Sequence, residues 1–346
     1  MRIIFAGGGT GGHLYPAVAV AEQLKKNGVE FHFMVSDRAI DGNIIAPLGY
    51  SYTPQKVSAY MGKGIIGKIK AVFKMVFAVF EAMKIVRKGD RVMLTGGFAA
   101  AAPAIAAIIK GCPLYLHEQN SVMGLVNRIF AEKCRKVFLS FKDTLNAKGN
   151  ITVTGNPVRN KFYEMPEKTG YDGNLLVMGG SQGSRKINNL IIEAVDDIMA
   201  AGFTLTHQTG KGLYDEVMKS YGEKADIYKD KLFIKNYIDN APQVMSEADM
   251  IISRSGAGAV FEIRALNCPA VYIPFGAASE NHQYYNALEV EKMKGCIILD
   301  EALSDKKSLM DALLNIKNNI DDFRNNLRNN RPERSAEIIA KEICAD

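Results

Sequence analysis

The sequence predicts an α/β protein made of two Rossmann-like, doubly wound domains. Three observations support this fold class. The chain has 346 residues, which exceeds one ordinary core and suits two domains of roughly 150 residues each. Short apolar runs alternate with helix-like stretches throughout. The two halves also begin alike, because RIIFAGGGTGG and NLLVMGGSQGS each run from an apolar strand into a glycine turn.

The first half contains six apolar runs that are typical of buried parallel strands. They are Ile3–Ala6, Phe31–Val35, Arg91–Thr95, Leu114–His117, Lys136–Ser140 and Ile151–Thr154. The stretches Ala17–Lys26 and Ala101–Lys110 between them have helical character. A turn-rich segment, Gly155–Arg159, closes this half. We therefore place the first domain at residues 1–157.

The second half repeats this pattern and is predicted to form a domain at residues 158–334. Its expected strands are Leu175–Met178, Thr204–Gln208, Leu232–Lys235, Met250–Ser253, Ala270–Ile273 and Cys296–Leu299. The helix Ala257–Leu266 follows the fourth of them. After about residue 318 the chain is polar and helical. We expect a last helix, from about Ser335 to residue 346, to pack back on the first domain.

Composition excludes several classes of protein. The net charge of +6 arises within residues 60–88, which hold seven basic residues and one acidic residue, Glu81. The rest of the chain is balanced in charge, so the composition is not that of a nucleic-acid-binding protein. The five cysteines are odd in number and scattered, which favours reduced thiols in the cytoplasm. The first residues already form a strand, so we expect no signal peptide. No apolar run approaches the 18 or more residues of a membrane span.

Three glycine turns follow predicted strands: Gly7–Gly12, Gly179–Ser184 and Arg254–Gly258. Ligands bind off the carboxyl ends of such strands, where helix N-termini hold phosphates. The third turn is expected to present backbone N–H groups and the Ser255 hydroxyl to a diphosphate. Glu262, a little over one turn later, could bind ribose hydroxyls. A purely structural turn remains an alternative for this weak pattern.

Further polar side chains lie at the same predicted edge. His13 begins a helix and could act as a general base, or could instead bond to backbone. His117, Glu118, Gln119 and Asn120 follow a strand and are expected to lie outside the core, in a site or in a solvated loop. Arg159 could reach a phosphate. His282, Gln283 and Asn286 suit sugar hydroxyls, although they could also cap a helix.

Residues 60–88 combine lysines with apolar residues at helical spacing. Met75 and Val79 widen the apolar face beyond a normal core stripe. A basic helix of this kind can lie in the interface of an anionic membrane. A helix packed on its own sheet is the alternative, and both can hold together.

The motifs GGTGGH, HEQN, GNPVR, GGSQG, SRSGA and HQYYNA occur in this order from Gly8 to Ala287. With them, the chain resembles the MurG family of N-acetylglucosaminyltransferases, within glycosyltransferase family 28, from residue 1 to the C-terminal helix. The resemblance implies a GT-B fold, with the two domains facing across a cleft. It also implies an inverting hexosyltransferase that moves GlcNAc from UDP-GlcNAc to the C4 hydroxyl of undecaprenyl-diphospho-N-acetylmuramoyl-pentapeptide (lipid I), which gives lipid II for peptidoglycan.

The resemblance assigns roles to individual residues. His13 is the general base, and Glu118 assists on the acceptor side as a second catalytic residue. Glu262 holds the ribose, the Ile238 backbone the uracil, and Gln283 and Asn120 the sugar. The positions expected to bind UDP-GlcNAc are Thr10, Gly11, Gly12, Asn120, Arg159, Ser181, Ile238, Ser255, Gly256, Ala257, Gly258, Ala259, Val260, Phe261, Glu262 and Gln283. The membrane-docking residues are Ile65, Ile66, Lys68, Ile69, Lys70 and Phe73.

The expected partners are UDP-GlcNAc, lipid I, the anionic inner-membrane surface and other cell-wall synthesis proteins, with no nucleic acid. The expected location is peripheral, on the cytoplasmic face of the bacterial membrane. No HxH, no DxD and no pair of histidines at i,i+4 is present, so no cofactor or metal ion is expected. The departing UDP must then be stabilised by a helix N-terminus and Arg159.

The chain departs from the family pattern in three places. Gly96–Pro103 lacks a glycine and a serine, Ala259 stands where a hydroxyl residue is common, and Phe275–Asn281 lacks the usual charged residues. Two other functions remain as alternatives. Asp37 and the first glycine turn fit an NAD(P)-dependent oxidoreductase. A non-catalytic, two-lobed ligand-binding protein would also close on a ligand.

Overall fold

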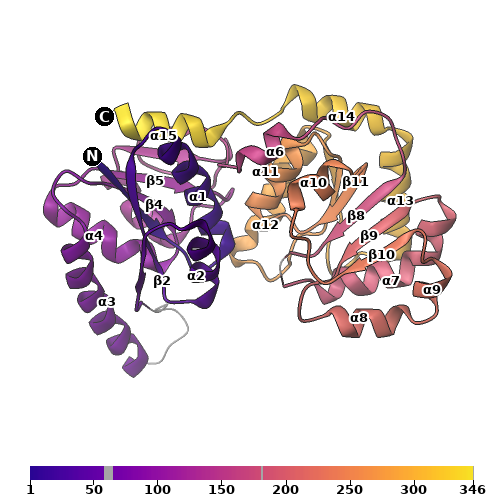
Figure 1. Cartoon of the computed structure of the whole chain (residues 1–346), viewed down its shortest axis with the longest axis horizontal. Coiled ribbons are helices and arrows are strands. Elements are labelled where there is room, and N and C mark those ends of the chain that lie inside the picture. The colour runs from indigo at the N-terminus through magenta and orange to yellow at the C-terminus, as the bar shows by residue number, and fades with distance from the viewer. Residues whose placement is uncertain (58–64, 181, 346) are drawn as a thin grey trace. The chain divides into compact units, whose positions relative to one another are not determined.

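The computed structural model describes residues 1–57, 65–180 and 182–345, without the side chains of residues 65–72 and 279. The chain divides into two compact units (Figure 1). The first comprises Met1–Arg159 and Glu333–Asp346, and the second comprises Asn160–Pro332. The first unit therefore takes residues from both ends of the chain.

The first unit is built on a seven-stranded parallel sheet with the order β3-β2-β1-β4-β5-β6-β7. Its strands are β1 Arg2–Gly7, β2 Glu30–Ser36, β3 Tyr52–Gln55, β4 Arg91–Gly96, β5 Leu114–Glu118, β6 Lys136–Leu139 and β7 Ile151–Val153. Strand order reverses between β1 and β4, as in a doubly wound sheet. The predicted fold class is confirmed for this unit.

The strand β3 was not predicted from the sequence. It has only four residues and contains Pro54, which pairs opposite Val35 of β2. Proline cannot donate to a second neighbour, so it is tolerated only at the edge of a sheet. With this proline and only four residues, β3 contains no apolar run from which a strand could be predicted.

Helices cover both faces of this sheet. They are α1 Gly11–Lys26, α2 Ala39–Ile45, α3 Ile65–Ile85, α4 Ala101–Lys110, α5 Leu125–Phe130 and α15 Ser335–Ala345, with short 3-10 turns η1 Ala46–Leu48, η2 Phe98–Ala100 and η3 Ala131–Lys133. Successive residues of β1 face opposite sides. Ile3 and Phe5 pack with α1 and α15, whereas Ile4 and Ala6 pack with α3 and α4.

The helix α1 begins earlier than the predicted Ala17. It starts at Gly11 and runs through Pro16, which lacks the N–H that would donate to Gly12. Proline near a helix start costs one hydrogen bond but does not end the helix. This early start places His13 in the first turn.

The C-terminal helix α15 packs against α1 (Figure 1). The Ser335 hydroxyl donates to Thr154 O (2.5 Å), and Arg91 donates to Ile343 O. Ile339 and Ile343 are fully buried in the core on this face. The helix thus completes the hydrophobic core of the first unit.

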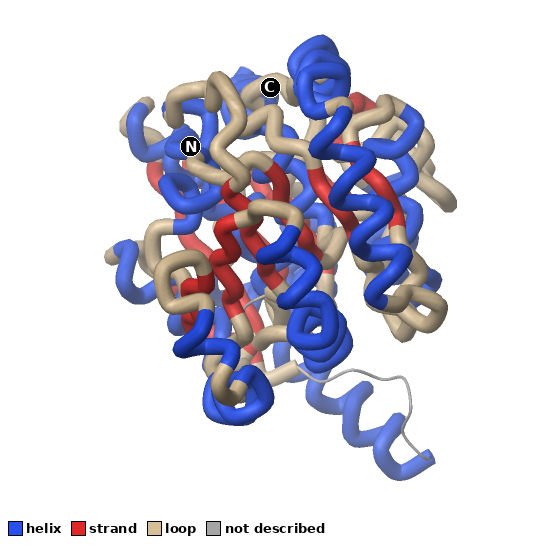
Figure 2. Tube along the Cα trace, turned by 90° about the vertical axis from the view of Figure 1, so that its right-hand side faces the viewer, coloured by secondary structure: helices blue, strands red, loops and turns tan. Residues whose placement is uncertain are grey.

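The second unit has a six-stranded parallel sheet with the order β10-β9-β8-β11-β12-β13. Its strands are β8 Asn174–Met178, β9 Thr204–Gln208, β10 Leu232–Lys235, β11 Met250–Ser253, β12 Ala270–Tyr272 and β13 Cys296–Ile298. All six strands were predicted. Figure 2 shows strands of this unit lying between helices.

The helices of the second unit are α6 Asn160–Glu164, α7 Arg185–Ala200, α8 Tyr214–Tyr221, α9 Lys224–Ile227, α10 Ala241–Ser246, α11 Ala257–Ala265, α12 His282–Lys292, α13 Lys306–Asn318 and α14 Ile320–Asn329, with the 3-10 turn η4 Ser279–Asn281. One core combines Leu175 and Val177 of β8 with Ile191 of α7 and Leu313 of α13. Because α7, α11 and α12 follow parallel strands β8, β11 and β12, their N-terminal ends lie toward the carboxyl ends of the strands.

A buried carboxylate ties three segments of the second unit together. Asp249, just before β11, is fully buried and accepts hydrogen bonds from the backbone N–H groups of Asp172 (3.0 Å) and Asn174 (2.9 Å). Its other oxygen accepts from Arg324 Nη2 of α14 (2.7 Å). Arg324 is itself 6% exposed. The pair joins α14 to the start of β8 and β11.

Candidate active site

The side chain of His13 is held by the end of β4. Its Nδ1 lies 3.0 Å from the Thr95 carbonyl oxygen. A carbonyl only accepts, so Nδ1 carries the proton of a neutral ring and Nε2 keeps its lone pair. Gln119 Nε2 lies 2.7 Å from the same Nδ1, and since two donors cannot share this contact, we assign the flipped amide, in which Oε1 faces the ring and accepts from Nδ1. Nε2 is therefore the basic atom.

Two glycines pack against this imidazole and were not predicted as site residues. Gly96 and Gly97 have φ angles of +94° and +78°. A Cβ at Gly96 would lie 2.9 Å from His13 Nδ1, and one at Gly97 would lie 2.4 Å from Gly8 O. Tandem glycines directly after a strand were the available signal. In the sequence, this loop stands out only as a departure from the family pattern.

Gly96→Ala is expected to lower turnover by about 100-fold, because the new methyl displaces His13 from its position. Gly89→Ala is the matched control. Gly89 has the same φ of +94°, yet its added Cβ would meet no atom within 4 Å. Both variants place a side chain at the same positive φ, so steady-state kinetics of the pair tests the contact with His13. Equal losses of turnover in the two variants would contradict this role for Gly96.

The first glycine turn is fixed by a carboxylate of the protein itself. Gly9 N donates to both oxygens of Asp41 (3.0 and 2.8 Å), and Ser36 donates through its N–H (3.0 Å) and hydroxyl (2.6 Å). Asp41 is fully buried, whereas Asp37 is exposed. The negative charge occupies a loop N–H that a dinucleotide phosphate would use. This arrangement disfavours the oxidoreductase alternative.

The expectation that the HEQN motif lies outside the core was wrong for three of its residues. His117, Glu118 and Gln119 are all buried. His117 Nε2 lies 3.2 Å from the Ser140 hydroxyl, and burial lowers the pKa of His117 to about 3. The motif ends a strand that is covered on both faces, so these three side chains are buried, and His117 Nδ1 and, with the amide unflipped, Gln119 Oε1 are left without a hydrogen-bond partner among the described residues.

Glu118 is 1% exposed, and its carboxylate holds the loop that follows. It accepts hydrogen bonds from Asn120 N (3.0 Å), Gly124 N (2.9 Å) and Asn127 Nδ2 (2.7 Å). Burial raises the pKa of Glu118, while these hydrogen bonds oppose the shift. The geometry suits a positioning role for Glu118, and its predicted catalytic role stays a prediction.

The other predicted residues of the first unit lie near α1. Thr10 and Gly12 are exposed, and Gly11 and Asn120 are half-buried. The guanidinium carbon of Arg159 lies 5.5 Å from the centre of the Tyr15 ring. Thus Thr10, Gly11, Gly12, His13 and Arg159 all belong to the N-terminal end of α1 or contact it.

In the second unit, the glycine turn after β8 crosses the end of β9. Gly183 has φ +77°, and a Cβ there would lie 1.9 Å from Thr209 O. Gln208 Nε2 donates to Gly180 O (3.2 Å). Only glycine fits this crossing. Ser181, a predicted donor-binding residue, lies outside the described residues.

The turn after β11 leads into the N-terminus of α11. No side chain caps this end, and the first intrahelical bond runs from Val260 N to Gly256 O (3.0 Å). The N–H groups of residues 257–259 therefore precede the hydrogen-bond ladder and are suited to an anion. The side chains of Ala257, Val260, Phe261 and Ile238 are buried, so only their backbone can face a ligand. Glu262 is half-buried.

The hydroxyl of Ser255 has a different role from the one predicted. It is fully buried and donates to Gln283 O (2.8 Å), and Asn286 Nδ2 donates to Ser255 O (3.1 Å). The hydroxyl joins the turn to α12 and does not face a diphosphate. Gln283 Oε1 accepts from Phe275 N (3.0 Å), which orients this amide.

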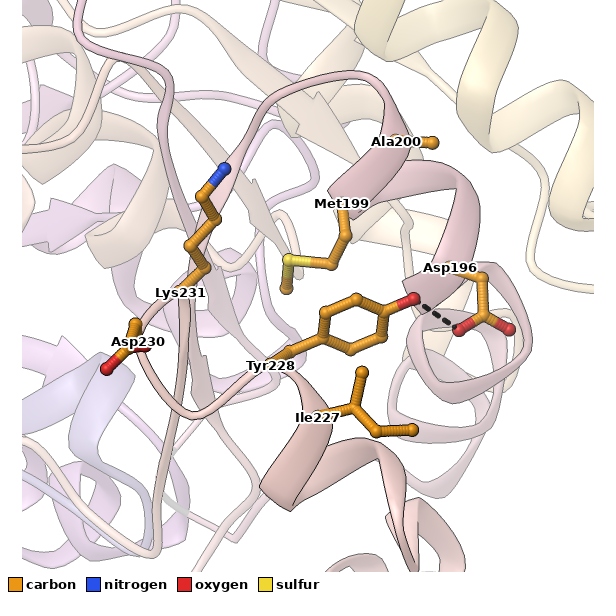
Figure 3. A pocket seen from close by; sticks show the side chains of 7 residues that line it. All are labelled: Asp196, Met199, Ala200, Ile227, Tyr228, Asp230 and Lys231. Atoms are coloured by element: carbon orange, nitrogen blue, oxygen red, sulfur yellow. Dashed lines mark hydrogen bonds between the residues drawn. The ribbon is translucent and has the colours of Figure 1, made fainter.

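A groove of about 390 Å³ elsewhere in the second unit is lined by none of these residues (Figure 3). It lies beside α7 and α9, where the Tyr228 hydroxyl donates to Asp196 (3.0 Å). Within residues 1–57, 65–180 and 182–345, no group of three or more His, Cys, Asp or Glu side chains is placed to hold a metal ion. No helix in these ranges is long and apolar enough to cross a bilayer.

Residues 3–139 match the glycosyltransferase family 28 N-terminal domain, and residues 174–342 match its C-terminal domain. The chain is similar to two proteins named UDP-N-acetylglucosamine–N-acetylmuramyl-(pentapeptide) pyrophosphoryl-undecaprenol N-acetylglucosamine transferase. The one from Helicobacter pylori J99 is 34% identical, covering 94% of this chain and 93% of the relative. The one from Desulforamulus reducens is 31% identical, covering 98% and 97%. The fold is similar to the crystal structure of Acinetobacter baumannii MurG, with a TM-score of 0.79, 24% identity, and coverage of 100% and 99%.

Proposed function

Since this chain belongs to glycosyltransferase family 28, we propose that it transfers N-acetylglucosamine from UDP-GlcNAc to the C4 hydroxyl of lipid I, which forms lipid II in peptidoglycan synthesis. It is an N-acetylglucosaminyltransferase with two parallel α/β domains. The observation that carries the proposal is the 34% identity to the Helicobacter pylori transferase over 94% of the chain. The hydrogen-bonded His13 adds a suitable base.

Donor binding is assigned mainly to the second unit. The N-terminus of α11 offers its unpaired N–H groups and its dipole to the diphosphate, beginning at Gly256. Glu262 would bind the ribose, the Ile238 backbone the uracil, and Gln283 the sugar. Ser181 and, from the first unit, Thr10, Gly11, Gly12, Asn120 and Arg159 complete the proposed donor contacts.

The reaction is a single displacement. The acceptor C4 hydroxyl gives its proton to His13 Nε2 while its oxygen attacks the anomeric carbon. The new bond joins this oxygen to C1, and the bond from C1 to the β-phosphate oxygen breaks, which inverts the anomeric centre. The departing UDP takes the electron pair, and the α11 N-terminus with Arg159 stabilises its charge. We propose that no metal ion is needed.

The test is transfer of labelled GlcNAc from UDP-GlcNAc to a lipid I analogue, with and without EDTA. Product formation that EDTA leaves unchanged would support both the function and its metal independence. Product that disappears with EDTA would contradict only the metal independence. Failure to transfer, with binding of NADH in its place, would favour the oxidoreductase.

We further propose that α3 docks the enzyme on the cytoplasmic face of an anionic membrane. Ala78 and Ala82 of α3 are buried in the core, whereas Phe73, Phe77 and Phe80 are 73%, 62% and 61% exposed. The start of α3 projects from the other helices of its unit (Figures 1 and 2). One helix therefore has both a core face and an apolar outer face. The side chains of Ile65, Ile66, Lys68, Ile69 and Lys70 lie outside the described residues.

The triple replacement Phe73→Ser, Phe77→Ser and Phe80→Ser is expected to reduce binding to phosphatidylglycerol vesicles at least about tenfold, because full burial of even one ring contributes roughly 2 kcal/mol, which exceeds the roughly 1.4 kcal/mol of a tenfold change. The matched control replaces Ile227 (67% exposed) and Leu303 (82% exposed) of the second unit by serine. Vesicle sedimentation should show no loss for the control. Unchanged vesicle binding by the folded triple variant would contradict the docking face. Contacts with other cell-wall synthesis proteins stay a prediction.

A further inference from the structure

Arg254, in the turn between β11 and α11, ties together the ends of several strands. Its Nη1 donates to Ile273 O (2.9 Å) and Pro274 O (3.1 Å), just after β12. Its Nη2 donates to the Ser184 hydroxyl (2.7 Å), at the N-cap of α7, and to the carboxylate of Glu301, beyond β13. One guanidinium thus joins segments that follow β8, β11, β12 and β13.

Glu301 extends this hydrogen-bond network to the segment that precedes α12. Its second oxygen accepts from Gly276 N (2.9 Å). The neighbouring Phe275 donates its N–H to Gln283 Oε1 and lies beneath the Arg254 guanidinium, 5.4 Å from ring centre to Cζ. Burial opposes the shift, but the hydrogen bonds from Gly276 and Arg254 hold the pKa of Glu301 below its usual value.

This geometry limits what Arg254 can bind. Of the five N–H hydrogens of a guanidinium, four lie on its two Nη atoms, which form the fork that grips a phosphate. All four are engaged, and the side chains of Arg254 and Glu301 are only 13% and 14% exposed. An arginine beside a helix N-terminus would ordinarily be taken as a phosphate ligand. Here its charge is already matched by a carboxylate.

We propose that Arg254 and Glu301 form a positioning pair that sets the spacing of the three segments around the donor, residues 182–184, 253–258 and 273–283, and that Arg254 is not a phosphate ligand. This inference rests on the proposed function, because it assumes that UDP-GlcNAc binds at these segments. Arg254 donates to Ser184, and the neighbours of the paired residues, Ser255 and Phe275, both donate to Gln283, a proposed donor-binding residue.

Glu301→Gln distinguishes a phosphate ligand from a positioning residue at Arg254, because the two roles predict opposite changes in the Kd of UDP. If Arg254 were a phosphate ligand restrained by Glu301, removing the negative charge would strengthen UDP binding. A positioning pair predicts the reverse, because glutamine loses the ion pair that holds the segments. We expect the Kd of UDP by calorimetry and the KM of UDP-GlcNAc to rise about tenfold. The KM of the lipid I analogue should stay within about twofold.

Two further variants complete the test. Glu216→Gln removes a carboxylate from an exposed pair with Arg185 on α7 and should leave the Kd of UDP unchanged. Arg254→Lys keeps the positive charge but loses the two Nη groups of the guanidinium. Its Kd for UDP should therefore rise as in Glu301→Gln. A lower or unchanged Kd in Glu301→Gln would overturn the inference. Absence of UDP binding by the unaltered chain would contradict the proposed function, and the inference with it.

Discussion

His13→Ala is expected to lower kcat by about 10² to 10⁴-fold, because it removes the proposed general base. The Kd of UDP should stay within about twofold, since donor binding is assigned mainly to the second unit. The Thr95 carbonyl that fixes Nδ1 lies 3.0 Å away, so the lost hydrogen bond costs only about 1 kcal/mol of stability. Single-turnover transfer of labelled GlcNAc to a lipid I analogue measures the effect.

His32→Ala is the matched control for this variant. His32 is also half-buried and hydrogen-bonded, with Nε2 2.9 Å from the Thr53 hydroxyl, but it lies on β2 away from the glycine turn. It should retain turnover within about threefold. If His13→Ala kept full turnover while folded, the base would have to be another group. If both histidine variants lost turnover equally, the loss would reflect the fold of the first unit and not proton transfer.

Arg324→Ala is expected to destabilise the second unit by about 3 kcal/mol, because it removes the cation that is hydrogen-bonded to the buried Asp249 carboxylate. Lys168 Nζ still lies 3.8 Å from Asp249 Oδ1, but it is hydrogen-bonded to Asp172 (2.7 Å) and compensates only in part. The two units need not unfold together, so calorimetry is the suitable measurement. The transition that UDP raises identifies the second unit.

A surface ion pair of the same unit provides the comparison. Lys224 and Asp196 lie 2.7 Å apart with side chains 36% and 52% exposed. Lys224→Ala should change stability by less than about 1 kcal/mol. Similar losses in the Lys224 and Arg324 variants would show that burial of Asp249 is not what makes its ion pair strong.

The strands could be predicted because a parallel strand that is covered on both faces must be apolar along its whole length. The same rule missed β3, whose Pro54 and four-residue length suit an edge and leave no apolar run. It also misled the reading of HEQN. Polar residues at a strand end suggested exposure, but His117 Nε2 is hydrogen-bonded to Ser140 and the Glu118 carboxylate accepts from the following loop. Distant partners of this kind leave no mark in local sequence.

In the candidate site, too, residues with a local sequence signal were predicted, whereas contacts with distant residues were not. His13 was found because histidine after a glycine turn is unusual for a cofactor loop. Asp41 was missed, since an acid inside a helix has no spacing that distinguishes it from Asp37. Arg254 and Ser255 were correctly placed at a strand end. Their hydrogen bonds to Glu301 and Gln283 depend on chain segments 28 or more residues away and needed coordinates.

Because the last helix belongs to the first unit, the two units can complete their folding at different times during synthesis. Residues 160–332 form their own unit, so this unit can fold as soon as it has left the ribosome. The core of the first unit can be completed only after α15 has been made, because Ile339 and Ile343 of this helix pack with α1. Until translation reaches them, the apolar surface of α1 stays open to chaperones and to aggregation. The part of the protein that is made first is therefore the last to be finished.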